Sequence, residues 1–212
     1  MAEKLYDFAL TTLDRVKQRM GITSTDNDAV LQRLINAVTD FVEGECQRRF
    51  KQATYADEVH SIWGNNLTFL CVNQMPIVSV AKLEYRAGTP GTPNWTQLGA
   101  DFWEIVEDGA SGMIRLYPGF APMLYTQTNA LRATYTAGYL IDFDNFGDPS
   151  KHNLPADLSD FSERLIVRWW KRRESGGKQS ESLQNSSITW KDLLDGEDVD
   201  TLARYTKPQE FI

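Results

Sequence analysis

Two pairs of carboxylates are the residues whose type and spacing could support acid–base chemistry. Glu104 lies close to Glu107 in the sequence, and Asp142 lies close to Asp144. Paired carboxylates can act as general acid and as nucleophile or base in glycoside hydrolysis. No spacing rule places either pair across a cleft, and carboxylates are common at the loop edges of an acidic protein. We therefore interpret them as surface residues and keep a small β-rich hydrolase as an alternative function.

Histidine-based chemistry has few residues to draw on. The chain contains 2 histidines: His60 lies in an alternating, strand-like run, and His152 lies just before a predicted helix. The sequence predicts a surface or loop position for both. The glycine-rich phosphate-binding motifs and the GxSxG and HExxH motifs are absent from the sequence. We therefore expect no catalytic residues, no metal site and no cofactor.

A basic group follows two tryptophans near the predicted end of a helix. Lys171, Arg172 and Arg173 come directly after Trp169 and Trp170. Cations beside aromatic rings can bind single-stranded nucleic acid, and cations also suit the negative end of a helix dipole. We favour the helix-end interpretation, in which the three cations could also make a charge contact with an acidic neighbouring subunit.

The composition describes a globular chain with an acidic surface. Hydrophobic residues make up 42% of the 212 residues, which is enough apolar surface to form a core. The net charge of -7 opposes tight nucleic-acid binding, but it lets DNA pass nearby without adhering. No stretch approaches the roughly 18 apolar residues of a membrane-spanning helix, so we expect no membrane partner. Cys46 and Cys71 are too few for a disulfide framework, which predicts free thiols and synthesis in a reducing cytoplasm.

Three segments have the apolar periodicity of amphipathic helices. The pattern predicts helices over residues 11–21, 26–48 and 154–173. In the first helix, Thr11 and Asp14 form a candidate capping box, and Gly21 is a candidate stop. The polar face of the second helix, which includes Glu43 and Arg48, is expected to face solvent or a neighbouring subunit.

The middle of the chain, from about residue 51 to residue 144, has the composition of β-strands. Runs rich in β-branched and aromatic residues lie at 67–72, 77–85, 102–106, 113–117 and 130–135. The segment 87–94 is rich in Gly and Pro, so we predict that it cannot continue a strand. Segment 108–112 is predicted to form a tight hairpin connection. The sequence therefore predicts a small antiparallel sheet or barrel.

The last part of the chain is predicted to be a linker followed by a docking arm. Residues 174–182 are polar and rich in Ser and Gly, which is typical of a linker or an exposed loop. Beyond them, apolar residues stand among acidic ones in a segment too short to fold alone. Such an arm docks either on the chain's own core or on another chain, and the sequence leaves both partners open.

Together these elements predict an α+β fold with a helical core, an inserted antiparallel β-sheet or small barrel, and an extended C-terminal arm. The length fits one domain, or a core with one embedded subdomain. We assign the N-terminal helical part, the β-rich insertion, the core helix and the linker with its docking arm to residues 1–50, 51–150, 151–175 and 176–212.

The order of these segments resembles the phage head–tail connector family, the adaptor or head-completion proteins that attach beneath the portal ring of tailed phages. The similar segments include the first helix, the end of the second helix, a strand–Pro–strand run and an LPADL helix start: residues 12–22, 26–28, 42–50, 70–80, 132–139 and 154–158. Each motif is short, and their common order makes the resemblance specific. The predicted sheet is longer than in the minimal, nearly all-helical members.

The resemblance implies a structural virion protein without catalysis. Such proteins form a dodecameric-type ring, bound on one side to the portal protein ring and on the other to a stopper or tail-completion protein. Genomic DNA would pass through the lumen of the ring without specific binding. The implied location is the neck of the virion, at the head–tail interface.

The resemblance also implies contact residues, because the C-terminal segment in this family commonly reaches the portal. The expected portal or subunit contacts are the apolar anchors of the predicted arm: Trp190, Leu193, Leu194, Leu202, Tyr205, Phe211 and Ile212. Apolar and aromatic anchors concentrate the binding energy of protein interfaces. Two alternatives stay open, namely another neck component such as a stopper or tail terminator, and the β-rich hydrolase.

Overall fold

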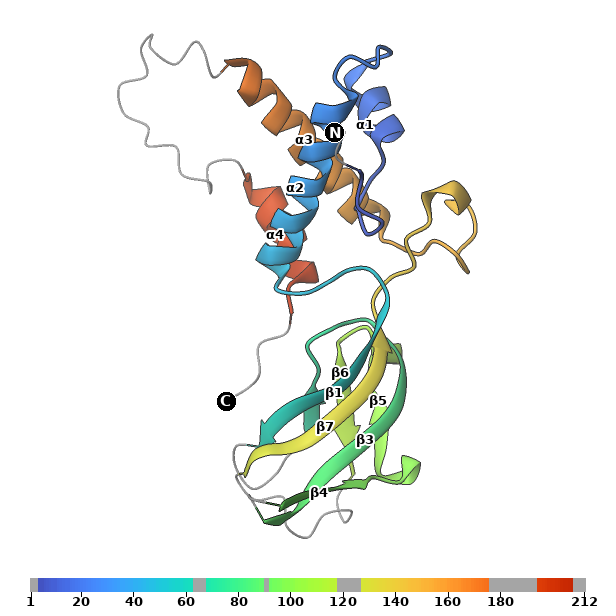
Figure 1. Ribbon diagram of the computed structural model, residues 1–212, viewed down its shortest axis with the longest axis vertical. Helices are drawn as coiled ribbons and strands as arrows, with labels where there is room; N and C mark the ends of the chain where they lie inside the picture. The colour runs from blue at the N-terminus through green and yellow to red at the C-terminus, as the bar shows by residue number, and fades with distance from the viewer. Residues whose placement is uncertain (1–3, 63–67, 90–91, 118–126, 176–193, 208–212) are drawn as a thin grey trace, which may run out of the picture. The chain divides into compact units, whose positions relative to one another are not determined.

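The computed structural model divides the chain into two compact units (Figure 1). The described residues are 4–62, 68–89, 92–117, 127–175 and 194–207. The helical unit consists of Met1–Gln47 and Leu140–Thr206 and contains the α-helices. The β unit consists of Arg48–Tyr139 and Lys207–Ile212 and contains the β-strands. The predicted α+β fold class is therefore confirmed.

The described residues of the helical unit form four α-helices and one short 3-10 helix. These are α1 (Leu13–Met20), α2 (Asp28–Cys46), η3 (Phe143–Asn145), α3 (Ala156–Ser175) and α4 (Gly196–Tyr205). The first, second and third α-helices confirm the periodicity predictions, because their apolar stripes are the buried faces. Leu31 and Ile35 of α2 and Phe161 and Leu165 of α3 are all buried. None of the described helices is long and apolar enough to cross a membrane.

Helix α1 ends as predicted but begins one residue later than its candidate cap. The side chain of Thr12, rather than that of Thr11, accepts a hydrogen bond from the backbone N–H of Arg15. Gly21 closes the helix in the left-handed conformation, with φ of 68°. The Thr11 hydroxyl donates to the buried carboxylate of Glu163 at 2.9 Å, so it ties the start of α1 to α3.

The solvent-facing position expected for Glu43 and Arg48 is wrong, since both residues are buried. Arg48 lies beyond the end of α2, where Gln47 adopts a left-handed conformation with φ of 53°. The chain therefore leaves the helical periodicity before Arg48. Its guanidinium lies 4.7 Å from the centre of the Phe50 ring and donates to the carbonyl oxygen of Met75 at 2.9 Å.

The structure also corrects the extended arm expected at the C-terminus, because part of it forms α4. Asp195 and Asp198 make a reciprocal capping box at the start of this helix. Leu202 provides the buried apolar contact of α4, and it is 6% exposed. Of the two partners left open for the arm, the described part packs on its own core.

The described residues of the β unit form two antiparallel sheets. The strands and 3-10 helices are β1 (Ala53–Ile62), β2 (Phe69–Cys71), β3 (Ile77–Thr89), β4 (Thr92–Gln97), η1 (Ala100–Phe102), β5 (Trp103–Ile105), η2 (Glu107–Gly109), β6 (Met113–Leu116) and β7 (Gln127–Ala137). One sheet has the order β1-β7-β3-β4, and the other has the order β2-β6-β5. One apolar cluster joins Leu131 and Tyr135 of the first sheet to Ile114 and Leu116 of the second. The sheets therefore pack face to face, and the described strands close no barrel.

One turn prediction in this unit is confirmed in part and one is wrong. Residues 108–112 lie in the connection between the antiparallel strands β5 and β6, as predicted, but the connection also contains η2 and is longer than a tight hairpin turn. In contrast, segment 87–94 does not end the strand, because β3 continues to Thr89 and pairs with β4. Pro93 is tolerated there because β4 is an edge strand of its sheet, where one side of the backbone needs no partner.

Candidate interaction surfaces

The candidate contact residues of the C-terminal arm fall into two groups. Trp190, Leu193, Phe211 and Ile212 lie outside the residues that the structure describes. Within the described part, Leu194 and Tyr205 are half-buried and Leu202 is buried. Leu202 therefore stabilises the chain's own helical unit, and a partner could contact its side chain only if α4 moved. Portal contact by all seven residues stays a prediction.

Charged contacts hold the start of α4 against α3. Asp198 is fully buried, and its carboxylate accepts hydrogen bonds from the Arg168 guanidinium and from the N–H of Asp195. The Asp195 carboxylate accepts from the N–H of Asp198 at 2.9 Å and pairs with Arg168 at 2.7 Å. Arg164 of α3 lies 3.7 Å from the Asp198 carboxylate. The two carboxylates therefore cap α4 and bind the arginines of α3 at the same time.

The end of α4 is fastened to the start of α3. The Tyr205 hydroxyl donates to the Asp157 carboxylate at 2.6 Å, and Arg204 pairs with the same carboxylate at 3.4 Å. The Cys46 thiol of α2 lies 3.8 Å from the carbonyl oxygen of Leu202. Because the start of α4 contacts the later turns of α3 and its end contacts the first turn, the two helices run antiparallel.

The contacts between α4 and α3 favour the ionised forms of Asp195 and Arg168. The N–H of Asp198 holds the pKa of the Asp195 carboxyl below its usual range, and the charge of Arg168 acts in the same direction. Burial alone would lower the pKa of the Arg168 guanidinium, but hydrogen bonds and charges from Asp198 and Asp195 raise it overall. At neutral pH these groups therefore form an ion pair.

The basic group that the sequence places after two tryptophans lies at the end of α3, as the helix-end interpretation predicts. Lys171 and Arg173 are exposed, and Arg172 is half-buried. The Arg173 guanidinium lies 5.0 Å from the centre of the Trp170 ring, which is itself buried. The charge contact of these residues with a neighbouring subunit stays a prediction.

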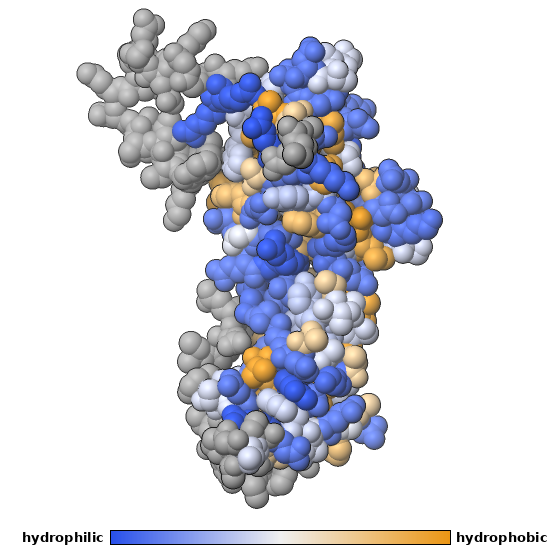
Figure 2. Space-filling model, viewed as in Figure 1, coloured by the Kyte–Doolittle hydropathy of each residue, from blue (hydrophilic) through white to orange (hydrophobic). Residues whose placement is uncertain are grey.

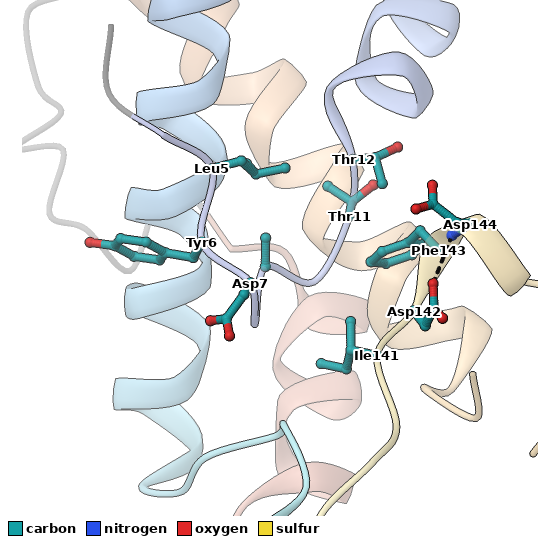
Figure 3. Close-up of a pocket in the computed structure, with 10 residues that line it drawn as sticks. Leu5, Tyr6, Asp7, Thr11, Thr12, Ile141, Asp142, Phe143 and Asp144 are labelled. Carbon is teal, nitrogen blue, oxygen red and sulfur yellow. Dashed lines mark hydrogen bonds between the residues drawn. The ribbon is translucent and has the colours of Figure 1, made fainter. Parts of the chain in front are cut away.

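The helical unit contains an acidic pocket of about 260 Å³ (Figure 3). Three carboxylates and three apolar side chains dominate its lining: Asp7, Asp142 and Asp144 with Leu5, Ile141 and Phe143. Figure 3 shows Asp7 on one side, on the N-terminal segment, and Asp142 and Asp144 on the other. The Asp144 N–H donates to the Asp142 carboxylate at 3.1 Å, which fixes that turn. Lys and Arg are absent from the ten lining residues.

His152 lies in the loop before α3, as the surface-or-loop prediction allows, but its imidazole is buried and only 5% exposed. Its ring centre lies 4.7 Å from that of Phe143 and 5.0 Å from that of Phe146. The Nδ1 atom accepts a hydrogen bond from the N–H of Asp142 at 3.2 Å. Burial lowers the pKa of His152, and the nearby Arg15 guanidinium lowers it further. The imidazole is therefore neutral at pH 7 and supports the segment that carries Asp142.

His60 lies in β1 and is buried, so the surface or loop position predicted for it is wrong. Its Nε2 atom lies 2.9 Å from the Glu58 carboxylate, which also accepts from the Tyr135 hydroxyl at 2.7 Å and from the N–H of Asn73 at 2.9 Å. Burial alone would raise the pKa of Glu58, but these hydrogen bonds lower it below its usual range. Burial and the Glu58 carboxylate raise the pKa of Tyr135. The polar side chains thus satisfy one another inside the β unit.

The carboxylate pairs considered for acid–base chemistry serve structural contacts. Glu104 forms an ion pair with Arg115 at 2.9 Å on the surface of the smaller sheet. Asp142 accepts from the Asp144 N–H and, at 2.8 Å, from the side-chain amide of Asn145. Glu104 and Asp142 therefore each bind neighbouring side chains or backbone of their own unit. These structural contacts weaken the hydrolase alternative.

Apolar and metal-binding side chains are dispersed over the described residues. On the face shown in Figure 2 the surface is mostly hydrophilic, with hydrophobic residues in separate small groups. Large exposed hydrophobic residues occur in both units and include Phe69, Phe102 and Phe146. No group of three or more His, Cys, Asp or Glu side chains in the described part could hold a metal ion.

Cys46 and Cys71 are free thiols, as predicted.

The resemblance indicated by the sequence motifs is confirmed by comparison with a family model. Residues 10–67 match the model of the phage gp6-like head–tail connector proteins, a range that includes α1, α2 and β1. No curated protein matches the chain.

Two solved structures share the fold over nearly the whole chain. A chain in the neck of an empty GTA particle, computed with C6 symmetry, is similar with a TM-score of 0.52 and 16% identity over 100% of this chain and 97% of that chain. A chain in the virion of a native gene transfer agent particle is similar with a TM-score of 0.50 and 16% identity over 99% of this chain and 95% of that chain. At this identity, the similarity shows a common fold.

Proposed function

From the match of residues 10–67 to the phage head–tail connector family, we propose that the chain is a structural subunit of the neck of a tailed particle. The family match is the observation that carries the proposal. The shared fold supports it, because both units of this chain have counterparts in a chain of a particle neck.

Within the neck, the proposed role is an adaptor ring that lies beneath the portal and extends the DNA channel. Rings form when two different patches of one subunit contact each other in successive copies. A neck computed with C6 symmetry supports a ring, and a six-fold axis is compatible with the twelve copies that the resemblance implies. The other face of the ring would provide the docking surface for a stopper or tail-completion protein.

The acidic composition supports a channel that DNA passes without binding. The net charge of -7 repels the phosphate backbone, so the lumen would retain DNA weakly. An adaptor with this charge needs no sequence-specific contact with the genome.

The C-terminal residues are the proposed portal contacts, but Leu202 is a weaker candidate than the others. Because Leu202 is buried in the helical unit, the anchors Trp190, Leu193, Phe211 and Ile212 are the better candidates for direct contact. Leu194 and Tyr205 are half-buried and retain accessible surface for a partner. Aromatic anchors are the residues from which we expect the largest energetic contributions.

Light scattering of the chain mixed with its cognate portal ring tests the adaptor role. We expect a stoichiometric complex, and we expect Trp190→Ala to weaken it at least about tenfold, because truncating a hot-spot aromatic costs about 2 kcal/mol or more. Phe69→Ala, which removes an exposed aromatic ring of the β unit, is the control and should leave affinity unchanged. If the chain does not bind the portal ring, the adaptor role is contradicted and another position in the neck is favoured.

A further inference from the structure

The end of α3 carries exposed cations beside a buried tryptophan. Lys171 and Arg173 are exposed, while the Trp170 ring beneath the Arg173 guanidinium is 7% exposed. The contact with a buried tryptophan restricts the Arg173 side chain, so less of its conformational entropy is lost when it meets a partner. This end of the helix therefore has the properties of a docking surface for an acidic partner.

The acidic pocket of the helical unit has the complementary chemistry. Its lining combines the carboxylic acids Asp7, Asp142 and Asp144 with apolar side chains that include Leu5 and Phe143 (Figure 3). Arginine and lysine place a charged head on an aliphatic stem, so they fit a site that combines carboxylates with apolar surface. The volume of about 260 Å³ accommodates side chains of this size.

Within one molecule, the basic end of α3 is too far from the acidic pocket to contact it. Glu163 of α3 pairs with Arg15, and the Arg15 guanidinium lies 5.8 Å from the centre of the Phe143 ring in the pocket. The pocket is therefore close to the level of Glu163 on α3. From there to Arg173 the helix rises by about 15 Å, at about 1.5 Å per residue, which is more than one side chain spans.

We propose that the end of α3 in one copy, with Lys171 and Arg173, docks in the pocket lined by Asp7, Asp142 and Asp144 of the next copy. This contact rests on the proposed function, in which copies form a ring. Copies with a net charge of -7 repel one another at long range, so patches of opposite sign favour this contact over contacts between like charges. Because the two patches differ, the contact is heterologous and repeats from copy to copy.

Sedimentation velocity of the full chain over a range of concentrations tests this contact. The basic-end variant carries Lys171→Glu and Arg173→Glu, and the pocket variant carries Asp7→Lys and Asp144→Lys. Asp142 is left unchanged because its carboxylate holds the turn. We expect each variant to self-associate at least about tenfold more weakly than the natural chain. The combined variant restores opposite charges, so its association should return to within about threefold of the natural chain.

Matched controls change the charge equally at exposed positions elsewhere in the helical unit. They are Lys4→Glu with Arg33→Glu, and Asp14→Lys with Asp26→Lys. Variants that associate like these controls, or a combined variant that stays weak, would overturn the proposed contact. A natural chain that remains monomeric up to about 1 mM would overturn it too. If such a chain still enters particle necks, only this contact fails and the proposed function stands.

Discussion

Asp198→Ala is expected to release α4 from the helical unit. The carboxylate of Asp198 is fully buried, binds Arg168 and Arg164, and closes the capping box with Asp195. Removing one partner of a buried ion pair leaves the other charge uncompensated. The side chains of Arg168 and Arg164 are 33% and 27% exposed and can reach water, so we expect a loss near the lower end for such pairs, about 2–3 kcal/mol.

Amide hydrogen exchange of α4 measures this loss directly. Residues 196–205 should exchange faster in Asp198→Ala by one to two orders of magnitude, since about 1.4 kcal/mol corresponds to a factor of ten. Asp200→Ala is the matched control, because Asp200 lies in the same helix with an exposed side chain. Equal exchange in the two variants would show that α4 is held by contacts other than this carboxylate.

Gly138→Ala is expected to destabilise the β unit by about 3 kcal/mol or more. Gly138 has φ of 106°, which L-residues rarely adopt, and an added Cβ would lie 2.8 Å from the Phe50 carbonyl oxygen and 2.9 Å from the Gln52 backbone. The Phe50 and Gln52 backbones already bond to Tyr139 on both sides, at 2.7 Å each, so they cannot withdraw freely. Backbone strain and overpacking each cost about 1–3 kcal/mol.

Gly44→Ala, in contrast to Gly138→Ala, is expected to stabilise the chain. Gly44 lies inside α2, and an added Cβ would have no other atom within 4 Å. Alanine favours a helix interior by up to about 1 kcal/mol relative to glycine, so this variant should be more stable than the natural chain. Chemical denaturation distinguishes the two substitutions, and a neutral Gly138→Ala would mean that the close approach at this position can relax.

The elements that follow local periodicity could be predicted from the sequence, and those that depend on distant partners could not. The first three α-helices agree with their apolar stripes because each stripe is also the buried face. Thr12 displaced Thr11 as the cap of α1 because the Thr11 hydroxyl binds Glu163, which is 152 residues away. No local pattern contains that partner.

Helix α4 had a local signal that indicates a helix start. Asp195 and Asp198 have the spacing of a capping box, and Leu202 follows at a helical interval. Their position among acidic residues in a short tail favoured an extended arm instead. The arginines of α3 that pair with these carboxylates explain why an acidic segment folds back on this chain.

The candidate surfaces were harder to predict than the helices. The basic end of α3 follows from the sequence, since Lys171 and Arg173 close a predicted helix. The acidic pocket does not, because it brings Asp7 together with Asp142 and Asp144 across more than one hundred residues of sequence. The burial of His60 could not be predicted, because the Glu58 carboxylate beside it also binds Tyr135, which is 77 residues from Glu58 in the sequence.

Cryo-electron microscopy of particles assembled with and without this chain tests the central claim most directly. The structural account predicts density for both units in the neck, repeated around the particle axis, and heads that lack tails when the chain is absent. Particles that carry normal necks and tails without the chain would contradict a structural role at the head–tail interface.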